Sequence, residues 1–203
     1  ASFARNAAQQ ALSWQIDTEG HDPPLVLFNN QPFPFEGVIE TEDLGFSVGT
    51  RTRGELALAD GNSNPIPHQS VEPHTICGRR RFVTRVSIPA LGYRVLRQTT
   101  AYQNPSRRLL GKQAVRAKDS SIGNDRLRVS LDRRGYLVIH DRQTRRKVFD
   151  KAGAVPLVIE DTSDTWSHGV KAFRKVAGRF KRTSAEVIES GPVRGRISVS
   201  YAW

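Results

Sequence analysis

Side chains that can do chemistry gather most densely in one segment of this 203-residue chain, EDTSDTWSHG at residues 160–169. The segment follows an apolar run and combines carboxylates with an indole and an imidazole. An aromatic ring can stack on the face of a sugar, and carboxylate and imidazole groups can hydrogen bond to its hydroxyls. The combination favours the lip of a carbohydrate site, with Asp164, Trp166 and His168 as candidate rim residues. The alternative is an acidic loop in which Asp164 caps a turn and Trp166 packs on the edge of a sandwich.

Two aspartates of this segment, Asp161 and Asp164, raise the question of a glycosidase acid/base pair. Such a pair needs carboxyl groups about 5 to 10 Å apart, on either side of a cleft. The sequence does not establish a cleft. No residue of this chain is therefore assigned a catalytic role.

Other motifs that carry chemistry are missing from the sequence. It has no Gly-rich phosphate loop, no G-x-S-x-G elbow and no H-E-x-x-H. The single cysteine, Cys77, cannot form an intramolecular disulfide and is expected to be a small apolar residue. We expect ordinary polar roles, and no metal ligation, for the histidines at 21, 68, 74, 140 and 168. A cofactor-dependent or triad enzyme is disfavoured, and no cofactor is predicted for this chain.

The elements that must position the 160–169 segment are predicted to be mostly β. Residues 1–17 are the exception, because their apolar residues recur at a spacing near 3.6, which predicts the end of an amphipathic helix. A linker follows up to residue 23, and Pro23 and Pro24 bar continuation of the helix. Short apolar runs broken by turn residues then predict an antiparallel sandwich over 24–101. Its expected strands are 25–28, 37–41, 53–59, 81–88 and 93–99, with a turn at 60–65.

The second half of the chain repeats this pattern. A polar, basic connection is expected over 102–119, and strands resume in a region spanning 120–203. DRRG at 132–135 and DRQT at 141–144 are typical of hairpin turns. The expected strands are 127–131, 136–140, 155–159, 185–189 and 193–201.

A net charge of +11 invites a nucleic-acid interpretation, because clustered Lys and Arg bind phosphates. The basic residues are concentrated between Arg107 and Lys147 and again between Lys171 and Arg182. They alternate with apolar residues, as in RLRVSL at 126–131, and no aromatic residues are interleaved for base stacking. A solvated strand face is the better interpretation, so nucleic-acid binding is kept only as an alternative. No apolar run approaches the roughly 20 residues that a membrane-spanning helix needs, so no membrane partner is expected.

Six short motifs, in order along nearly the whole chain, give a resemblance to one family. They are LVLFNNQPFP at 25–34, DGNSNPIPHQ at 60–69, IPALGYR at 88–94, GNDRLRV at 123–129, GYL at 135–137 with DR at 141–142, and ESGPVR at 189–194. Together they resemble the C-terminal β-rich portion of α-mannosidases of glycoside hydrolase family 38. The resemblance implies an N-terminal helical stub, an Ig-like sandwich over 24–101, and the truncated start of a large mutarotase-like sandwich over 120–203.

The resemblance also implies what this portion lacks. In that family a zinc site and the aspartate nucleophile lie in an N-terminal α/β barrel, and this chain contains no His-x-Asp pair that could match the zinc motif. The implied parent is a zinc-dependent, retaining α-mannosidase that acts on mannose-containing glycans. The chain itself is expected to be inactive and metal-free, to scaffold the barrel of the same polypeptide, and to bring residues 160–169 to the rim of the sugar site.

Further expectations concern the molecule as a whole. The chain lacks methionine and opens with Ala1, so it is interpreted as an internal piece, and its unfinished second sandwich predicts self-association through exposed strand edges. The lack of disulfides fits a cytoplasmic protein. A stand-alone carbohydrate-binding module is the main alternative function, for which Trp14, Trp166 and Trp203 are the available indoles.

Overall fold

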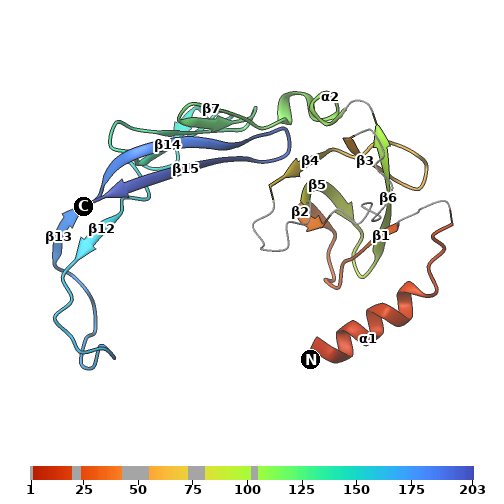
Figure 1. Ribbon diagram of the computed structural model, residues 1–203, viewed down its shortest axis with the longest axis horizontal. Coiled ribbons are helices and arrows are strands. Elements are labelled where there is room, and N and C mark those ends of the chain that lie inside the picture. Colours follow the sequence, from red (N-terminus) through yellow and green to blue (C-terminus); the bar gives the residue numbers. More distant parts are fainter. Residues whose placement is uncertain (1, 20–23, 43–54, 73–80, 102–104) are drawn as a thin grey trace. The chain divides into compact units, whose positions relative to one another are not determined.

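The computed structural model describes residues 2–19, 24–42, 55–72, 81–101 and 105–203. Cys77, His21 and His74 lie outside the described residues. The chain divides into two compact units, Ala1–Ala114 and Val115–Trp203, here called unit 1 and unit 2. As expected, the chain is mostly β with a helix at its N-terminus (Figure 1). None of the described helices is long and apolar enough to cross a membrane.

Unit 1 begins with helix α1 (Ser2–Ser13) and continues as two antiparallel three-stranded sheets. One sheet has the order β1-β6-β3, formed by Pro24–Phe28, Tyr93–Ala101 and Glu55–Ala59. The other has the order β2-β5-β4, formed by Phe35–Glu42, Arg81–Ile88 and His68–Val71. The expected helix over 1–17 ends earlier, at Ser13, where the Ser13 hydroxyl donates to the Gln9 carbonyl at 2.8 Å.

A single apolar cluster joins the two sheets of unit 1. It draws on both sheets because alternate residues of a strand point to the same face. Phe82 and Leu96, from the central strands β5 and β6, are completely buried. The cluster consists of Leu25, Leu58, Ile66, Phe82, Val86, Ile88 and Leu96. Two sheets that share one core form a sandwich, which is the architecture that the strand pattern predicts.

The stretch expected as a plain connection contains short elements. Helix α2 (Ser106–Leu110) is followed by a 3₁₀ turn, η1 (Gly111–Gln113), and then by strand β7 (Arg116–Lys118). Ser106 is fully buried, and its hydroxyl accepts the backbone N–H of His68 at 2.7 Å. His68 is also buried, and its Nδ1 lies 2.9 Å from the Ile66 carbonyl. These contacts give His68 a structural role, as an ordinary polar residue of the core.

Unit 2 contains one five-stranded antiparallel sheet and two hairpins. The sheet has the order β11-β10-β9-β8-β7, formed by Arg146–Lys147, Leu137–Asp141, Leu127–Leu131, Ser121–Gly123 and Arg116–Lys118. The hairpins are β12 (Leu157–Ile159) with β13 (Val176–Arg179), and β14 (Lys181–Ser190) with β15 (Gly195–Ala202). Figure 1 shows β14 and β15 as a long curved ribbon, and this ribbon contacts β7 and β8.

The turn between β14 and β15 requires a glycine at position 191. Gly191 has φ +93°, and a Cβ built on it would lie 1.8 Å from the Val115 carbonyl oxygen. The Val115 N–H donates to the Pro192 carbonyl at 2.7 Å. Any larger residue would push the turn away from the start of unit 2, so the GP pair at 191–192 fixes how the long hairpin meets β7.

Candidate functional site

The 160–169 segment lies in the loop that joins β12 to β13, at the outer end of that short hairpin (Figure 1). Two contacts close the base of the loop. The Glu160 N–H donates to the Lys175 carbonyl at 2.9 Å, and the Lys175 Nζ lies 2.7 Å from Glu160 Oε2. The two ends of the loop, Glu160 and Lys175, therefore lie next to each other, although 14 residues separate them in the sequence.

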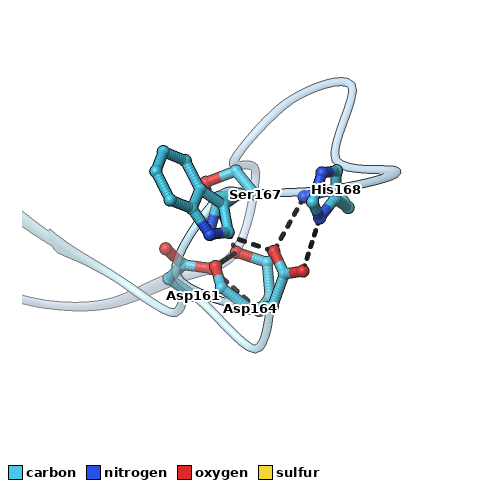
Figure 2. A network of polar contacts seen from close by, with 6 residues as sticks. Asp161, Asp164, Ser167 and His168 are labelled. Carbon is cyan, nitrogen blue, oxygen red and sulfur yellow. Dashed lines mark hydrogen bonds and ion pairs between the residues drawn. The ribbon is translucent and has the colours of Figure 1, made fainter.

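Asp164 organises the tip of this loop (Figure 2). Its Oδ1 accepts the backbone N–H of Trp166 at 3.1 Å and that of His168 at 3.0 Å. Its Oδ2 lies 2.6 Å from His168 Nδ1. Hydrogen bonds from the His168 N–H and imidazole are the main reasons that the pKa of Asp164 lies below its usual value. The carboxylate thus holds the turn and fixes the imidazole at the same time.

Asp161 has a similar but separate role. Its Oδ1 accepts both the backbone N–H and the hydroxyl of Ser163, and these two bonds lower the pKa of Asp161. A general acid of a glycosidase needs a raised pKa, so that the carboxyl keeps its proton near neutral pH. Asp161 and Asp164 both have lowered pKa values, which is the opposite of what a general acid requires. The lowered pKa values give no support for an acid/base pair in this loop.

Trp166 is 80% exposed and packs against no sheet edge. The structure therefore combines features of both interpretations of the segment: Asp164 does cap a turn, but Trp166 presents its ring to solvent. An exposed indole can stack on a sugar ring, and an imidazole can hydrogen bond to its hydroxyls. Asp164, Trp166 and His168 all lie in this one loop, and Figure 2 shows Asp164 and His168 side by side.

A cavity of about 580 Å³ lies along the two arms of the same loop. Its lining includes Glu160, Asp161 and Thr162 from one arm and residues 169–175 from the other. Sequence reasoning missed this second arm, because its basic residues were interpreted as part of a solvated face. The signal that could have found it is Phe173, an apolar ring set between Lys171 and Arg174. Phe173 is 47% exposed.

The described residues contain no group of three or more His, Cys, Asp or Glu side chains that could hold a metal ion. His140 lies on β10 and His168 in the β12–β13 loop, within different elements of unit 2. The described residues therefore offer no group that fits the zinc site, which the family resemblance assigns to a barrel outside this chain.

Comparison with solved structures finds the fold of this chain inside larger enzymes. An α-mannosidase from Enterococcus faecalis V583 matches 98% of this chain at a TM-score of 0.57 and 15% identity. A protein of glycosyl hydrolase family 38 from Enterococcus faecalis matches 88% at a TM-score of 0.54 and 14% identity. This chain spans about a quarter of the length of each, 26% and 24%. No protein-family model matches the chain, and no curated protein matches it either. The resemblance seen in the six sequence motifs is thus confirmed as a likeness of fold.

Proposed function

We propose that this chain is the β-rich scaffold of a retaining α-mannosidase resembling glycoside hydrolase family 38. The observation that carries the proposal is the likeness of fold over 98% of the chain to a quarter of an α-mannosidase. In such an enzyme two carboxylates form and then hydrolyse a glycosyl-enzyme intermediate. The chemistry, the zinc and the nucleophile belong to a barrel on the rest of the polypeptide. This chain supports the barrel and provides residues at the rim of the mannoside site.

The rim role is assigned to Asp164, Trp166 and His168. Trp166 offers an exposed ring, and Asp164 holds His168 with its Nδ1 engaged, which leaves the other ring nitrogen for a sugar hydroxyl. These residues bind and orient a glycan, and none of them transfers a proton in the reaction. The proposal therefore expects their loss to weaken binding more than turnover.

Hydrolysis of an aryl α-mannoside tests the division of labour. The 203-residue chain with added zinc is compared with the full-length parent. We expect turnover from the parent only, because the proposal assigns the chemistry to the barrel and both aspartates of the loop have lowered pKa values. A comparable rate from the chain alone would move the chemistry into unit 2 and overturn the proposal.

A stand-alone carbohydrate-binding module is a second candidate, favoured by the 80% exposure of Trp166. Titration of the chain with mannobiose, followed by tryptophan fluorescence, distinguishes the two. Trp14, which directly follows helix α1, is 82% exposed and provides a matched control. A module that binds without the parent is supported if mannobiose quenches the fluorescence, Trp166→Ala abolishes the quenching and Trp14→Ala leaves it intact. Absence of quenching in the isolated chain favours the scaffold, whose rim binds sugar only beside the barrel.

A further inference from the structure

Basic side chains from two distant segments of unit 2 line one pocket of about 450 Å³. The first segment is the tight turn between β9 and β10, which contributes Arg133 and Arg134. The second is the junction of β13 with β14, which contributes Arg179, Lys181 and Arg182. The volume lies within the range of about 300 to 1,000 Å³ that is typical of small-molecule sites. None of these residues lines the cavity of the 160–175 loop.

The arginine turn is held rigidly in its own conformation. The Asp132 side chain accepts the N–H of Arg134 at 2.8 Å and the N–H of Tyr136 at 2.9 Å, and the Gly135 N–H donates to the Asp132 carbonyl at 3.0 Å. These bonds preorganise the backbone that bears the two guanidinium groups, so a ligand would meet a formed site.

Two hydrogen bonds and one close approach hold this turn beside Phe180, Arg182 and Tyr201. The Tyr136 hydroxyl donates to the Phe180 carbonyl at 3.5 Å, and the Tyr201 hydroxyl donates to the Gly135 carbonyl. Gly135 has φ +86°, and a Cβ on it would lie 2.8 Å from Cβ of Arg182. Glycine thus permits the close approach that brings residues 133–134 beside residues 179–182.

The five cations of the pocket have no carboxylate partner. No ion pair joins any of them to an acidic side chain in the part of the chain that the structure describes. The turn's own Asp132 already accepts two backbone N–H groups. Like charges drawn together without a counter-charge repel one another, and a bound anion relieves that repulsion. Basic side chains that serve only as a solvated face would gain no stability from lining one pocket together.

The aromatic residues of the pocket favour a ligand that contains a ring. Tyr136 and Phe180 line the pocket together with the cations, and Tyr136 is only 5% exposed. Guanidinium groups form paired hydrogen bonds with phosphate oxygens, and an aromatic side chain can pack on a ligand ring. We propose that this pocket binds a small phosphate monoester carried on a ring, with the phosphate on the arginines and the ring against Phe180. This goes beyond the scaffold role and does not depend on it.

Calorimetric titration of the whole chain tests the site with three probes: inorganic phosphate, glucose 6-phosphate and glucose. We expect both phosphates to bind, the sugar phosphate more tightly, and neutral glucose not to bind. Equal affinity for the two phosphates would remove the ring from the assignment. Measurable binding of glucose would overturn the phosphate as the recognised group.

Charge-neutralising variants on each wall locate the site. R133Q/R134Q removes two cations from the turn, and R179Q/K181Q removes two from the β13–β14 junction. Each should weaken glucose 6-phosphate binding about tenfold or more, because hydrogen bonds to a charged group are strong. The control R142Q/R145Q removes the same charge from the exposed turn between β10 and β11, outside the pocket, and should change affinity less than about twofold.

Two outcomes would overturn the proposal. One is an equal loss of affinity in the control and the pocket variants, because net charge alone would then account for binding. The other is tighter binding of a short single-stranded oligonucleotide than of glucose 6-phosphate, with an affinity that falls equally steeply in the control and the pocket variants as salt rises from about 50 to about 200 mM. That result would indicate diffuse phosphate contacts. The altered residues are all exposed, so circular dichroism should show unchanged folding in every variant.

Discussion

At the scale of single residues, the tip of the 160–175 loop depends on one carboxylate. Asp164 binds two backbone N–H groups and one imidazole, which are all donors that favour its ionised form. Trp166 and His168 owe their positions to this residue, because both backbone N–H groups are its partners. The backbone of both residues is therefore held by Asp164, and we expect it to stay ordered only while Asp164 is charged.

This dependence predicts a pH effect on the loop. The pKa of Asp164 in the folded chain lies below its ordinary value of 3.8, so the stabilisation it gives is complete above about 3.8 and is lost as pH falls through the lower, folded-state value. NMR titration of the Trp166 and His168 amides should give a common midpoint below 3.8. Asp164→Asn should abolish the transition, and a midpoint at or above 3.8 in the wild-type chain would contradict the argument.

At the scale of elements, the β14–β15 hairpin carries a buried ion cluster beside its turn. Glu189 is almost fully buried and accepts hydrogen bonds from Arg194 Nε at 2.7 Å and from Arg196 Nη1 at 3.1 Å. Burial alone would raise the pKa of Glu189, but the two arginines outweigh it and lower the pKa below 4.5. The cluster therefore fastens the end of the long hairpin next to the Gly191 turn.

Glu189→Gln should destabilise this hairpin by about 2 kcal/mol, because two guanidinium groups lose a charged acceptor. Glu186→Gln, at an exposed position of the same strand, is the matched control and should cost less than about 0.5 kcal/mol. Urea denaturation near pH 7 measures both. The difference between wild type and Glu189→Gln should shrink as pH falls from 4.5 through the lower, folded-state pKa of Glu189, because the wild-type carboxylate becomes protonated over that range. A difference independent of pH would exclude the ion cluster as its cause.

The elements also show which parts of the structure a sequence can predict. Strands with clear apolar runs, such as β1 and β5, were predicted within a few residues, and Asp60 and Asp132 close the expected turns with their side chains. The strands β4, β7, β8, β11 and β13 were missed because they are short or polar, so that no clear apolar run marks them in the sequence. The basic pocket escaped prediction for a related reason, because its two walls are 45 residues apart in the sequence and are brought together by contacts of Gly135, Tyr136 and Tyr201.

At the scale of the whole molecule, apolar burial is unevenly shared between the two units. The largest fully buried side chains, among them Phe82, Leu58 and Leu96, all belong to unit 1. Within the described part of unit 2, Tyr136 and Val193 are the buried apolar residues, whereas Phe149, Ile159 and Val176 remain exposed. Burial of apolar area is the main stabilising contribution to folding, so unit 2 folds with the smaller reserve of stability. The self-association expected of its strand edges stays a prediction.

The uneven core predicts that the two units lose structure at different denaturant concentrations. Amide hydrogen exchange in the isolated chain should protect β5 and β6 of unit 1 more strongly than β9 and β10 of unit 2, by about tenfold or more, because local opening free energies follow buried apolar contacts. Addition of urea should release the unit 2 amides first. Equal protection of both sets would show that the units unfold as one cooperative body. Under the scaffold proposal, the full-length parent should raise protection in unit 2 above that in the isolated chain, since its exposed apolar residues would then find partners.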